Sequence, residues 1–194
     1  MLEASPLPAM IAELWDAPDA WFFYEQVFLK EGGLTRRTPW HQDSSYLAIA
    51  GRHLAVCWIS FDALEAADSL ECVRGSHLGR LYNGSRFELG DDTAPINPGS
   101  SPPRLPDIEA DRPAWDIVSD AVEPGDVVVF HPAMLHGGAA TRLGQRRRTL
   151  TLRFFGTDAV YDRRDGHAGL RLTGFHQRMR QGDRFRDPSY LKLA

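Results

Sequence analysis

The spacing of apolar residues changes along the chain, from a helical period near the N-terminus to short strand-like runs further on. In the segment Ser5 to Asp19, apolar side chains such as Ile11 and Trp15 recur at helical spacing. Ser5 followed by Pro6 is typical of a helix start, with serine as the cap and proline at the first helical position. We therefore predict one short amphipathic helix in this segment.

The strand-like runs are short and rich in aromatic and β-branched residues, which favour extended structure. They cover the segments Trp21 to Lys30, His53 to Phe61, Ser69 to Val73, Val127 to His131 and Arg146 to Phe155. The second run is mostly apolar, so we expect it to be buried on both faces. Many short strands joined by turns, with helical signal mainly at the start, predict a mainly β double-sheet barrel of the jelly-roll kind.

The last of these runs alternates, so its two sets of side chains face opposite sides of a sheet. One set is apolar and the other is polar: Leu150, Leu152 and Phe154 against Arg147, Thr149, Thr151 and Arg153. Arg146 and Arg148 point away from Arg147 and are expected in solvent. The three consecutive arginines also fit a second interpretation, an exposed basic edge that discourages strand pairing.

Two segments lack a regular pattern. Asn83 to Trp115 is rich in proline, glycine, serine and aspartate. Long irregular segments inside compact domains are usually functional loops or disordered. We expect either a lid over a substrate or a surface insertion without a role. The tail from Thr157 has little apolar periodicity, and we expect it to pack loosely or to cover a partner.

The composition fits a globular protein of one domain. A length of 194 residues is enough for one core and short for two, so residues 1–194 are predicted to form a single domain. The net charge of −4 argues against a nucleic-acid partner or an anionic membrane surface. The sequence shows neither a signal peptide nor an apolar run that could span a bilayer, which predicts a cytoplasmic location. Cys57 and Cys72 are then expected to be reduced.

A candidate metal site begins at His41 and Asp43. On an extended strand these two side chains point to the same face, because side chains alternate with a period of two. A second histidine would complete the facial triad of two His and one carboxylate that binds Fe(II). His136 is the candidate, since it follows a buried strand and is flanked by Gly137 and Gly138, which allow close backbone approach. Taken singly, the pair fits a surface turn, and a lone His is more often structural.

Arg147 lies eleven residues after His136, on the polar face of the next strand. A facial triad leaves three positions open on the metal, and a 2-oxo acid can occupy two of them through its keto and carboxylate oxygens. The distal carboxylate of that acid then needs a partner, which a guanidinium group provides with two parallel hydrogen bonds. Arg153 is the alternative partner if Arg147 does not take this role.

Several blocks of this sequence resemble the phytanoyl-CoA dioxygenase family. In chain order they read TPWHQDSSYL, VCWISFDAL, LECVRGSH, EPGDVVVFHPAMLHGG and RRRTLTLRFF. They lie between about Phe22 and Phe155, roughly two thirds of the chain. The resemblance implies a double-stranded β-helix, cupin-like, with a few flanking helices. It also implies Fe(II) held by His41, Asp43 and His136, with 2-oxoglutarate as cosubstrate.

The resemblance extends to the cosubstrate contacts. By position, Arg147 matches the arginine that pairs with 2-oxoglutarate, and Trp58 matches a tryptophan beside the cosubstrate. Gln26 lies where another contact is found, although the residue type differs. Lys30 shares the strand face of Gln26 and is a weaker candidate.

The sequence departs from the family pattern at two places. Arg74 replaces proline in the turn that resembles the family's Pro-Gly-Ser-His segment, and we expect Ser76 and His77 to be turn and packing residues. The stretch before Thr38 is also shorter than in the family, which would remove helices and at least one strand of the roll. The chain is therefore either a minimal member or an N-terminally truncated fragment.

We expect an oxidoreductase, an Fe(II)- and 2-oxoglutarate-dependent dioxygenase that hydroxylates a small organic substrate with dioxygen and releases succinate and CO2. A carboxylate at Asp43 fills the position that halogenases leave open for chloride, so hydroxylation is favoured. One alternative is a cupin-like metalloenzyme that does not use 2-oxoglutarate. The other is a truncated, inactive roll. No substrate-binding residue is assigned: Tyr46, Arg104, Asp107 and Glu109 are candidates for which a structural role is favoured. The oligomeric state is left open.

Overall fold

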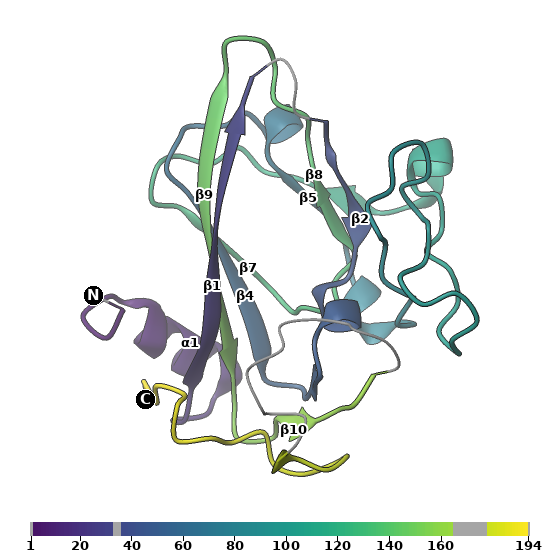
Figure 1. Cartoon of the computed structure of the whole chain (residues 1–194). Helices are drawn as coiled ribbons and strands as arrows, with labels where there is room; N and C mark the ends of the chain where they lie inside the picture. The colour runs from purple at the N-terminus through teal and green to yellow at the C-terminus, as the bar shows by residue number, and fades with distance from the viewer. Residues whose placement is uncertain (1, 33–35, 165–177, 194) are drawn as a thin grey trace.

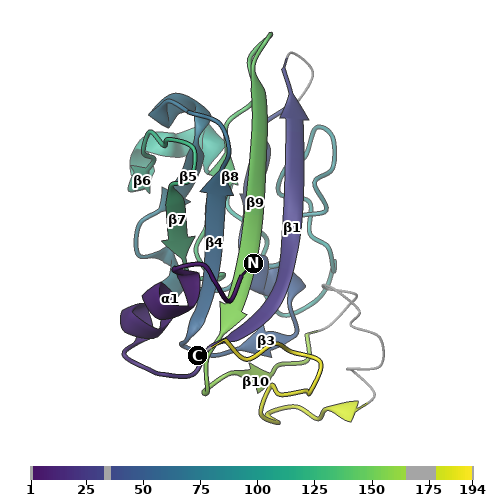
Figure 2. The ribbon, with the colours of Figure 1, turned by 90° about the vertical axis from the view of Figure 1, so that its left-hand side faces the viewer.

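The computed structural model describes residues 2–32, 36–164 and 178–193. Its larger sheet contains four antiparallel strands in the order β1-β9-β4-β7 (Figure 1). Helix α1 lies across part of the outer face of this sheet (Figure 2). The bounds of these elements are α1 (Leu7–Trp15), β1 (Trp21–Glu31), β4 (Leu54–Ser60), β7 (Val127–Phe130) and β9 (Arg146–Phe155).

A second antiparallel sheet, in the order β2-β8-β5-β6, faces the first across the interior of the molecule (Figure 1). Its strands are β2 (Thr38–His41), β5 (Leu70–Val73), β6 (Ile117–Val118) and β8 (His136–Gly138). A separate pair joins β3 (Ile49–Ala50) to β10 (Val160–Tyr161). The described residues also form four short 3-10 helices: η1 (Asp43–Tyr46), η2 (Ala66–Asp68), η3 (Ser76–Leu78) and η4 (Glu109–Ala114). Two facing antiparallel sheets with few helices confirm the predicted jelly-roll architecture.

The alternation in β9 separates the core from the site. Leu152 and Phe154 point outward and pack in one cluster with Ile11 of α1. The opposite face of β9 points between the two sheets, where Arg147 and Arg153 are only 7% and 6% exposed. One strand, β9, therefore contributes apolar side chains to the cluster under α1 and polar side chains to the interior of the roll. Arg146 and Arg148 are exposed, as predicted, so the alternative interpretation of one exposed basic edge is not the arrangement found.

The helix prediction is correct in place but wrong in its cap. The helix begins at Leu7, and its N-cap residue is Pro6, which offers no side-chain hydrogen bond. The Ser5 hydroxyl donates instead to the carbonyl oxygen of Leu2 at 2.6 Å and accepts only a long bond, 3.4 Å, from the amide of Leu7. The apolar face is as expected, since Ile11 is fully buried.

The irregular segment Asn83 to Trp115 packs beside the second sheet, next to β2 (Figure 1). Leu105 and Ile108 are buried there, in one cluster with Trp40 of β2. Most of the segment is without regular structure, as its proline content predicts. It is thus a packed cover over the outer side of β2.

The described end of the tail, residues 178–193, is mostly exposed, as a loosely packed tail would be, but two of its aromatic residues pack against the core. Phe185 is only 2% exposed and lies 5.3 Å from the Phe155 ring, centroid to centroid. Tyr190 stacks on Phe185. These aromatic residues pack where the start of β1 pairs with the end of β9. No periodic pattern in the sequence predicts their burial. Residues 165–177 of the tail lie outside the described residues.

Two smaller expectations concern the cysteines and membranes. Cys57 and Cys72 are both buried and unbridged, as expected. Burial raises the pKa of each thiol to about 12, so both stay protonated. Within the described ranges, the helices are too short or too polar to cross a bilayer.

Candidate metal centre

His41 and Asp43 are placed by the end of β2 and the turn that follows it. The strand stops at His41, Gln42 is still extended, and Asp43 opens the 3-10 helix η1. The prediction of one continuous strand through both residues is therefore wrong. The expected convergence nevertheless occurs, because Gln42 anchors the segment from the other side. Its side-chain amide donates to the carbonyl oxygen of Ala133 at 2.8 Å, and its carbonyl oxygen accepts the amide of Tyr82 at 2.8 Å.

His136 approaches from the neighbouring strand β8. It pairs directly with His41 in the β2-β8 ladder, and the two imidazole centroids are 4.1 Å apart. Gly137 follows it, and a Cβ there would lie 3.0 Å from the carbonyl oxygen of Thr38. The glycine therefore allows the close strand contact that brings the histidines together.

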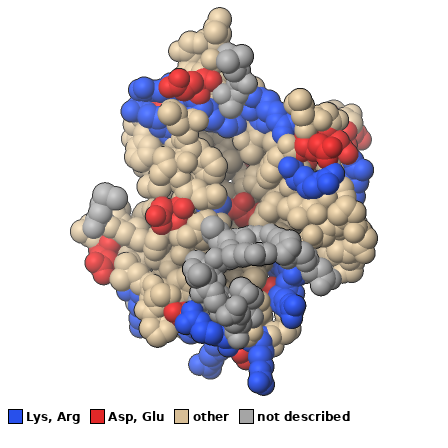
Figure 3. All heavy atoms as spheres, in the orientation of Figure 1, with Lys and Arg blue, Asp and Glu red and all other residues tan. Residues whose placement is uncertain are grey.

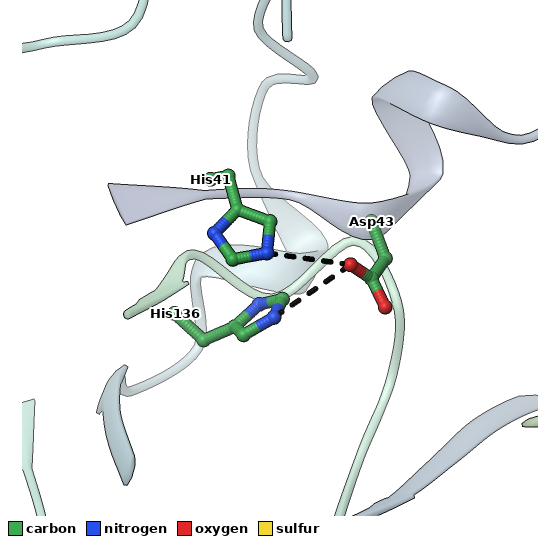
Figure 4. A group of neighbouring side chains, drawn as sticks. All are labelled: His41, Asp43 and His136. Atoms are coloured by element: carbon green, nitrogen blue, oxygen red, sulfur yellow. Dashed lines mark ion pairs between the residues drawn. The ribbon is translucent and has the colours of Figure 1, made fainter. Parts of the chain in front are cut away.

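The three side chains point toward one another (Figure 4). The Nε2 atoms of His41 and His136 lie 3.4 and 3.7 Å from Asp43 Oδ1, and one donor atom from each residue lies within 4.8 Å of the others. All three residues are at most 9% exposed. Two imidazoles and one carboxylate that converge on one point form the donor set of a facial triad.

Hydrogen bonds on the far side of each ring prepare the donors. Nδ1 of His41 lies 2.8 Å from the carbonyl oxygen of Pro39, and Nδ1 of His136 lies 2.9 Å from that of Met134. A carbonyl can only accept, so each Nδ1 carries the proton and each Nε2 keeps its lone pair for a metal. The residues present therefore fit a divalent metal such as iron.

The charges of the site suit the same purpose. Burial, reinforced by His41, lowers the pKa of His136 to about 3, so its imidazole is neutral near pH 7. Burial alone would raise the pKa of Asp43, but the neighbouring His41, His136 and Arg153 hold it well below its usual range. A neutral donor and an ionised carboxylate are the forms that a metal binds.

Arg153 holds the second oxygen of Asp43. Its Nε and Nη2 atoms donate to Asp43 Oδ2 at 3.0 and 2.7 Å, which leaves Oδ1 facing the histidines. The guanidinium packs over the Tyr24 ring, 4.4 Å from its centroid. Among the described residues, Arg153 Nη1 has no hydrogen-bond partner. Arg153 thus orients the carboxylate so that one oxygen is presented to a metal.

Replacing Arg153 by Met should weaken divalent metal binding roughly 10–100-fold, the usual effect of removing a group that supports a metal ligand. The reason is that Asp43 Oδ2 would be left buried and unpaired, free to rotate away. Anaerobic Fe(II) or Mn(II) titration measures the affinity. Arg146→Met is the matched control, because Arg146 is exposed on the same strand. Equal metal affinity in both variants would show that Asp43 needs no such support.

A cavity of about 330 Å³ opens beside the triad, between the two sheets. In the space-filling view this face of the molecule is hollowed between them (Figure 3). Arg147, Trp58, Gln26 and Lys30 all line the cavity, as do the three triad residues. The structure therefore brings together every residue that the sequence assigned to metal or cosubstrate.

Arg147 lies at the end of the cavity away from Arg153. Its Nη1 donates to the carbonyl oxygen of Asp68 at 2.7 Å and its Nη2 to that of Ala139 at 3.2 Å. Lys30 is its direct partner in the β1-β9 ladder, and the ammonium group donates to Thr38 Oγ1 at 2.7 Å. Burial, with Arg147 next to it, lowers the pKa of Lys30 to about 8. Arg147 is buried and Lys30 is half-buried, and two cations together at one end of the cavity favour an anionic ligand there.

The residues named as candidate substrate contacts divide into two groups. Tyr46 lines the cavity. Arg104 instead pairs with Asp91 at 2.5 Å, and Glu109 accepts from the indole of Trp40 at 2.7 Å. The Asp107 side chain accepts the backbone amide of Ala110 in η4 at 3.2 Å. Arg104, Asp107 and Glu109 therefore stabilise the segment that packs beside β2 and do not line the cavity.

One turn residue has the role that the sequence predicts. Ser76 has the expected turn role, since its hydroxyl donates to the carbonyl oxygen of Val73 at 2.7 Å and accepts the amide of Leu135 at 2.8 Å.

Sequence reasoning missed Tyr24, Phe28 and Phe87 as cavity residues. Tyr24 and Phe28 share the strand face of Gln26, so the alternation of β1 carried a signal for them. Phe87 had none.

The chain is similar in sequence to known phytanoyl-CoA dioxygenases. The family model described as phytanoyl-CoA dioxygenase (PhyH) matches residues 9–149. A probable phytanoyl-CoA dioxygenase of Caenorhabditis elegans is 28% identical over 131 residues, which cover 66% of this chain and 39% of that protein. The peroxisomal phytanoyl-CoA dioxygenase of Rattus norvegicus is 26% identical over 134 residues, which cover 67% and 37%. The chain thus spans less than two fifths of these curated relatives.

Solved structures share the fold at low sequence identity. The epimerase SnoN, in complex with Fe3+, alpha ketoglutarate and nogalamycin RO, matches with a TM-score of 0.70 and 17% identity over 100% of this chain and 72% of its own. The alpha ketoglutarate-dependent carbocyclase SnoK matches with a TM-score of 0.67 and 20% identity, covering 97% and 67%. EvdO2 from Micromonospora carbonacea var. aurantiaca, complexed with 2-oxoglutarate, matches at 0.62 and 20%, covering 82% and 63%.

Proposed function

Because the chain belongs to the phytanoyl-CoA dioxygenase family, we propose that it is an Fe(II)- and 2-oxoglutarate-dependent dioxygenase that hydroxylates a small organic substrate. The observation that carries this proposal is the buried convergence of His41, Asp43 and His136 on one point, with both Nε2 atoms free to bind a metal. Two solved structures of the same fold support it, one in complex with Fe3+ and alpha ketoglutarate and one with 2-oxoglutarate. Residues 1–194 act in this proposal as a single oxygenase domain.

Iron would be held by one atom from each triad residue, and the cosubstrate would bind beside it in the cavity. Iron and 2-oxoglutarate together supply the oxidation of substrate by dioxygen, with 2-oxoglutarate released as succinate and CO2. The chain itself contributes orientation. Arg153 turns Asp43 so that Oδ1 faces the site, and the two carbonyl-bound Nδ1 atoms keep the imidazoles in the required tautomer.

Arg147 is the proposed partner of the distal carboxylate of 2-oxoglutarate. It is buried at the far end of the cavity, where its two hydrogen bonds go to backbone carbonyl oxygens. Lys30 lies opposite on β1 and adds a second cation. Trp58 and Gln26 are proposed to contact the same cosubstrate, because both line this cavity from neighbouring strands of the larger sheet.

Hydroxylation is proposed over halogenation because Asp43 supplies a carboxylate. In a halogenase a small residue at this position leaves room for chloride on the metal. Here Asp43 Oδ1 already lies between the two histidine donors and is held there through its second oxygen. The chain's own carboxylate therefore occupies that place.

Adding 2-oxoglutarate to the anaerobic Fe(II) protein should produce a visible charge-transfer band, because the keto and carboxylate oxygens bind the metal together. Absorption spectroscopy measures it, with acetate as the control ligand. A protein that takes up Fe(II) but gives no band, and forms no succinate in air, favours a cupin-like metalloenzyme that does not use 2-oxoglutarate. A protein that takes up no metal favours an inactive roll.

A further inference from the structure

An aromatic pair, Tyr46 and Phe87, lies against one of the proposed metal ligands. The two rings stack with centroids 6.0 Å apart and an interplanar angle of 12°. The His41 ring lies 6.1 Å from Tyr46 and 5.4 Å from Phe87, centroid to centroid. Both residues line the cavity, and neither has a part in the metal or cosubstrate sites described above.

The backbone around Phe87 places its ring at the cavity. Phe87 has a φ of 54°, in the left-handed region that bulky residues rarely adopt. Its amide donates to Ser85 Oγ at 2.8 Å, and Arg36 donates to its carbonyl oxygen. Arg36 also pairs with Asp92 at 2.9 Å, which ties the loop to the segment before β2. Unfavourable backbone of this kind persists only where neighbours hold it, and it clusters at ligand sites.

Burial does not account for the position of Phe87. Its side chain remains 37% exposed although it faces the cavity. Leu89, in the same loop, is 87% exposed and points elsewhere. The backbone thus keeps the Phe87 ring partly exposed beside the proposed metal site. Its apolar face can therefore contact a ligand in the cavity.

The charges around this pair are already matched. Asp43 and Arg153 neutralise each other, and the cations Lys30 and Arg147 lie together on paired positions of β1 and β9 at the other end. The Tyr46 hydroxyl donates to the carbonyl oxygen of Ser85 at 2.8 Å. Within the described part of the chain, the region next to His41 therefore presents apolar ring surface without an unpaired charge. A charged group would lose its hydration there without gaining a partner.

We propose that Phe87 is a specificity-determining residue that, with Tyr46, holds an uncharged, flat ring of the substrate beside the metal site, and that Arg36 positions it. The inference rests on the proposed function only for the identity of the metal. A flat aromatic ring binds more favourably to aromatic side chains than a saturated ring does. It gains dispersion energy and can also adopt the stacked or edge-to-face geometry that aromatic pairs prefer.

Naphthol, an uncharged flat bicycle, is the probe, and decahydronaphthol is its saturated counterpart. Binding of each is measured on the metal-free chain by ligand-observed NMR. Naphthol should bind more tightly than decahydronaphthol, and Phe87→Ala should weaken naphthol binding about tenfold through loss of one ring contact. Arg36→Met should weaken it too, although Arg36 does not line the cavity. Leu89→Ala is the matched loop control and should change nothing.

Equal naphthol affinity in the natural chain and in Phe87→Ala would overturn the proposal, and so would equal binding of the two probes or no binding of naphthol. Phe87→Tyr keeps the aromatic ring and should bind naphthol as tightly as the natural chain does. This variant separates the loss of the ring from unfolding of the loop. Thermal unfolding of each variant checks the fold. Because no metal or turnover is needed, failure here leaves the proposed function standing. Absent succinate formation with intact naphthol binding would instead contradict that function alone.

Discussion

Replacing His136 by Ala is expected to abolish iron binding and, with it, succinate formation from 2-oxoglutarate. The imidazole supplies one of three donors that lie within 4.8 Å of one another, and no other histidine of the described residues lines the cavity apart from His41. Two donors do not hold Fe(II) in a facial site. The measurements are anaerobic Fe(II) titration and NMR detection of succinate.

His53→Ala is the matched control for this experiment. His53 pairs with Asp158 at 3.1 Å and does not line the cavity, so its loss should leave metal binding intact. Thermal unfolding of both variants separates metal loss from general instability. Unchanged turnover in His136→Ala would rule out the proposed metal centre.

Arg147→Ala should weaken 2-oxoglutarate binding by about a hundredfold while Fe(II) affinity changes little. A pair of charge-assisted hydrogen bonds contributes about 3 kcal/mol, which corresponds to that factor. Arg147 donates its hydrogen bonds to the carbonyl oxygens of Asp68 and Ala139 and not to a triad residue. The cosubstrate affinity is measured by titration of the anaerobic Fe(II) protein, and the apparent KM for 2-oxoglutarate by succinate formation.

Arg148→Ala serves as its control, because Arg148 is the exposed neighbour on the same strand and pairs with Asp62 at 2.6 Å outside the cavity. Arg147→Lys should retain part of the affinity, since it keeps the charge but not the two parallel bonds. Normal cosubstrate affinity in Arg147→Ala would move the role to another cation, with Lys30 the next residue at that end of the cavity.

The sequence alone determined those features that depend on local periodicity. The alternation in β9 predicts which side chains enter the roll, because a strand must put successive residues on opposite faces. The apolar run of β4 predicts burial on both faces. The alternation rule also predicts that His41 and Asp43 converge, but the strand ends at His41, and the two side chains meet across a turn that Gln42 anchors. The resemblance of sequence blocks predicts cosubstrate contacts for Arg147 and Trp58, and both residues line the cavity. Each of these inferences needs only a short stretch of chain.

The tertiary structure decided the features that depend on contacts distant in sequence. Arg153 and Asp43 are 110 residues apart, so no local pattern could show that this arginine holds the carboxylate. Phe87 enters the cavity because Arg36, 51 residues earlier, holds its carbonyl group. Short strands such as β8 are formed by pairing with β2 and β5, and Phe185 is buried by Phe155. Such contacts arise only when the chain is folded, because the free energy that stabilises them comes from partners that the local sequence does not contain.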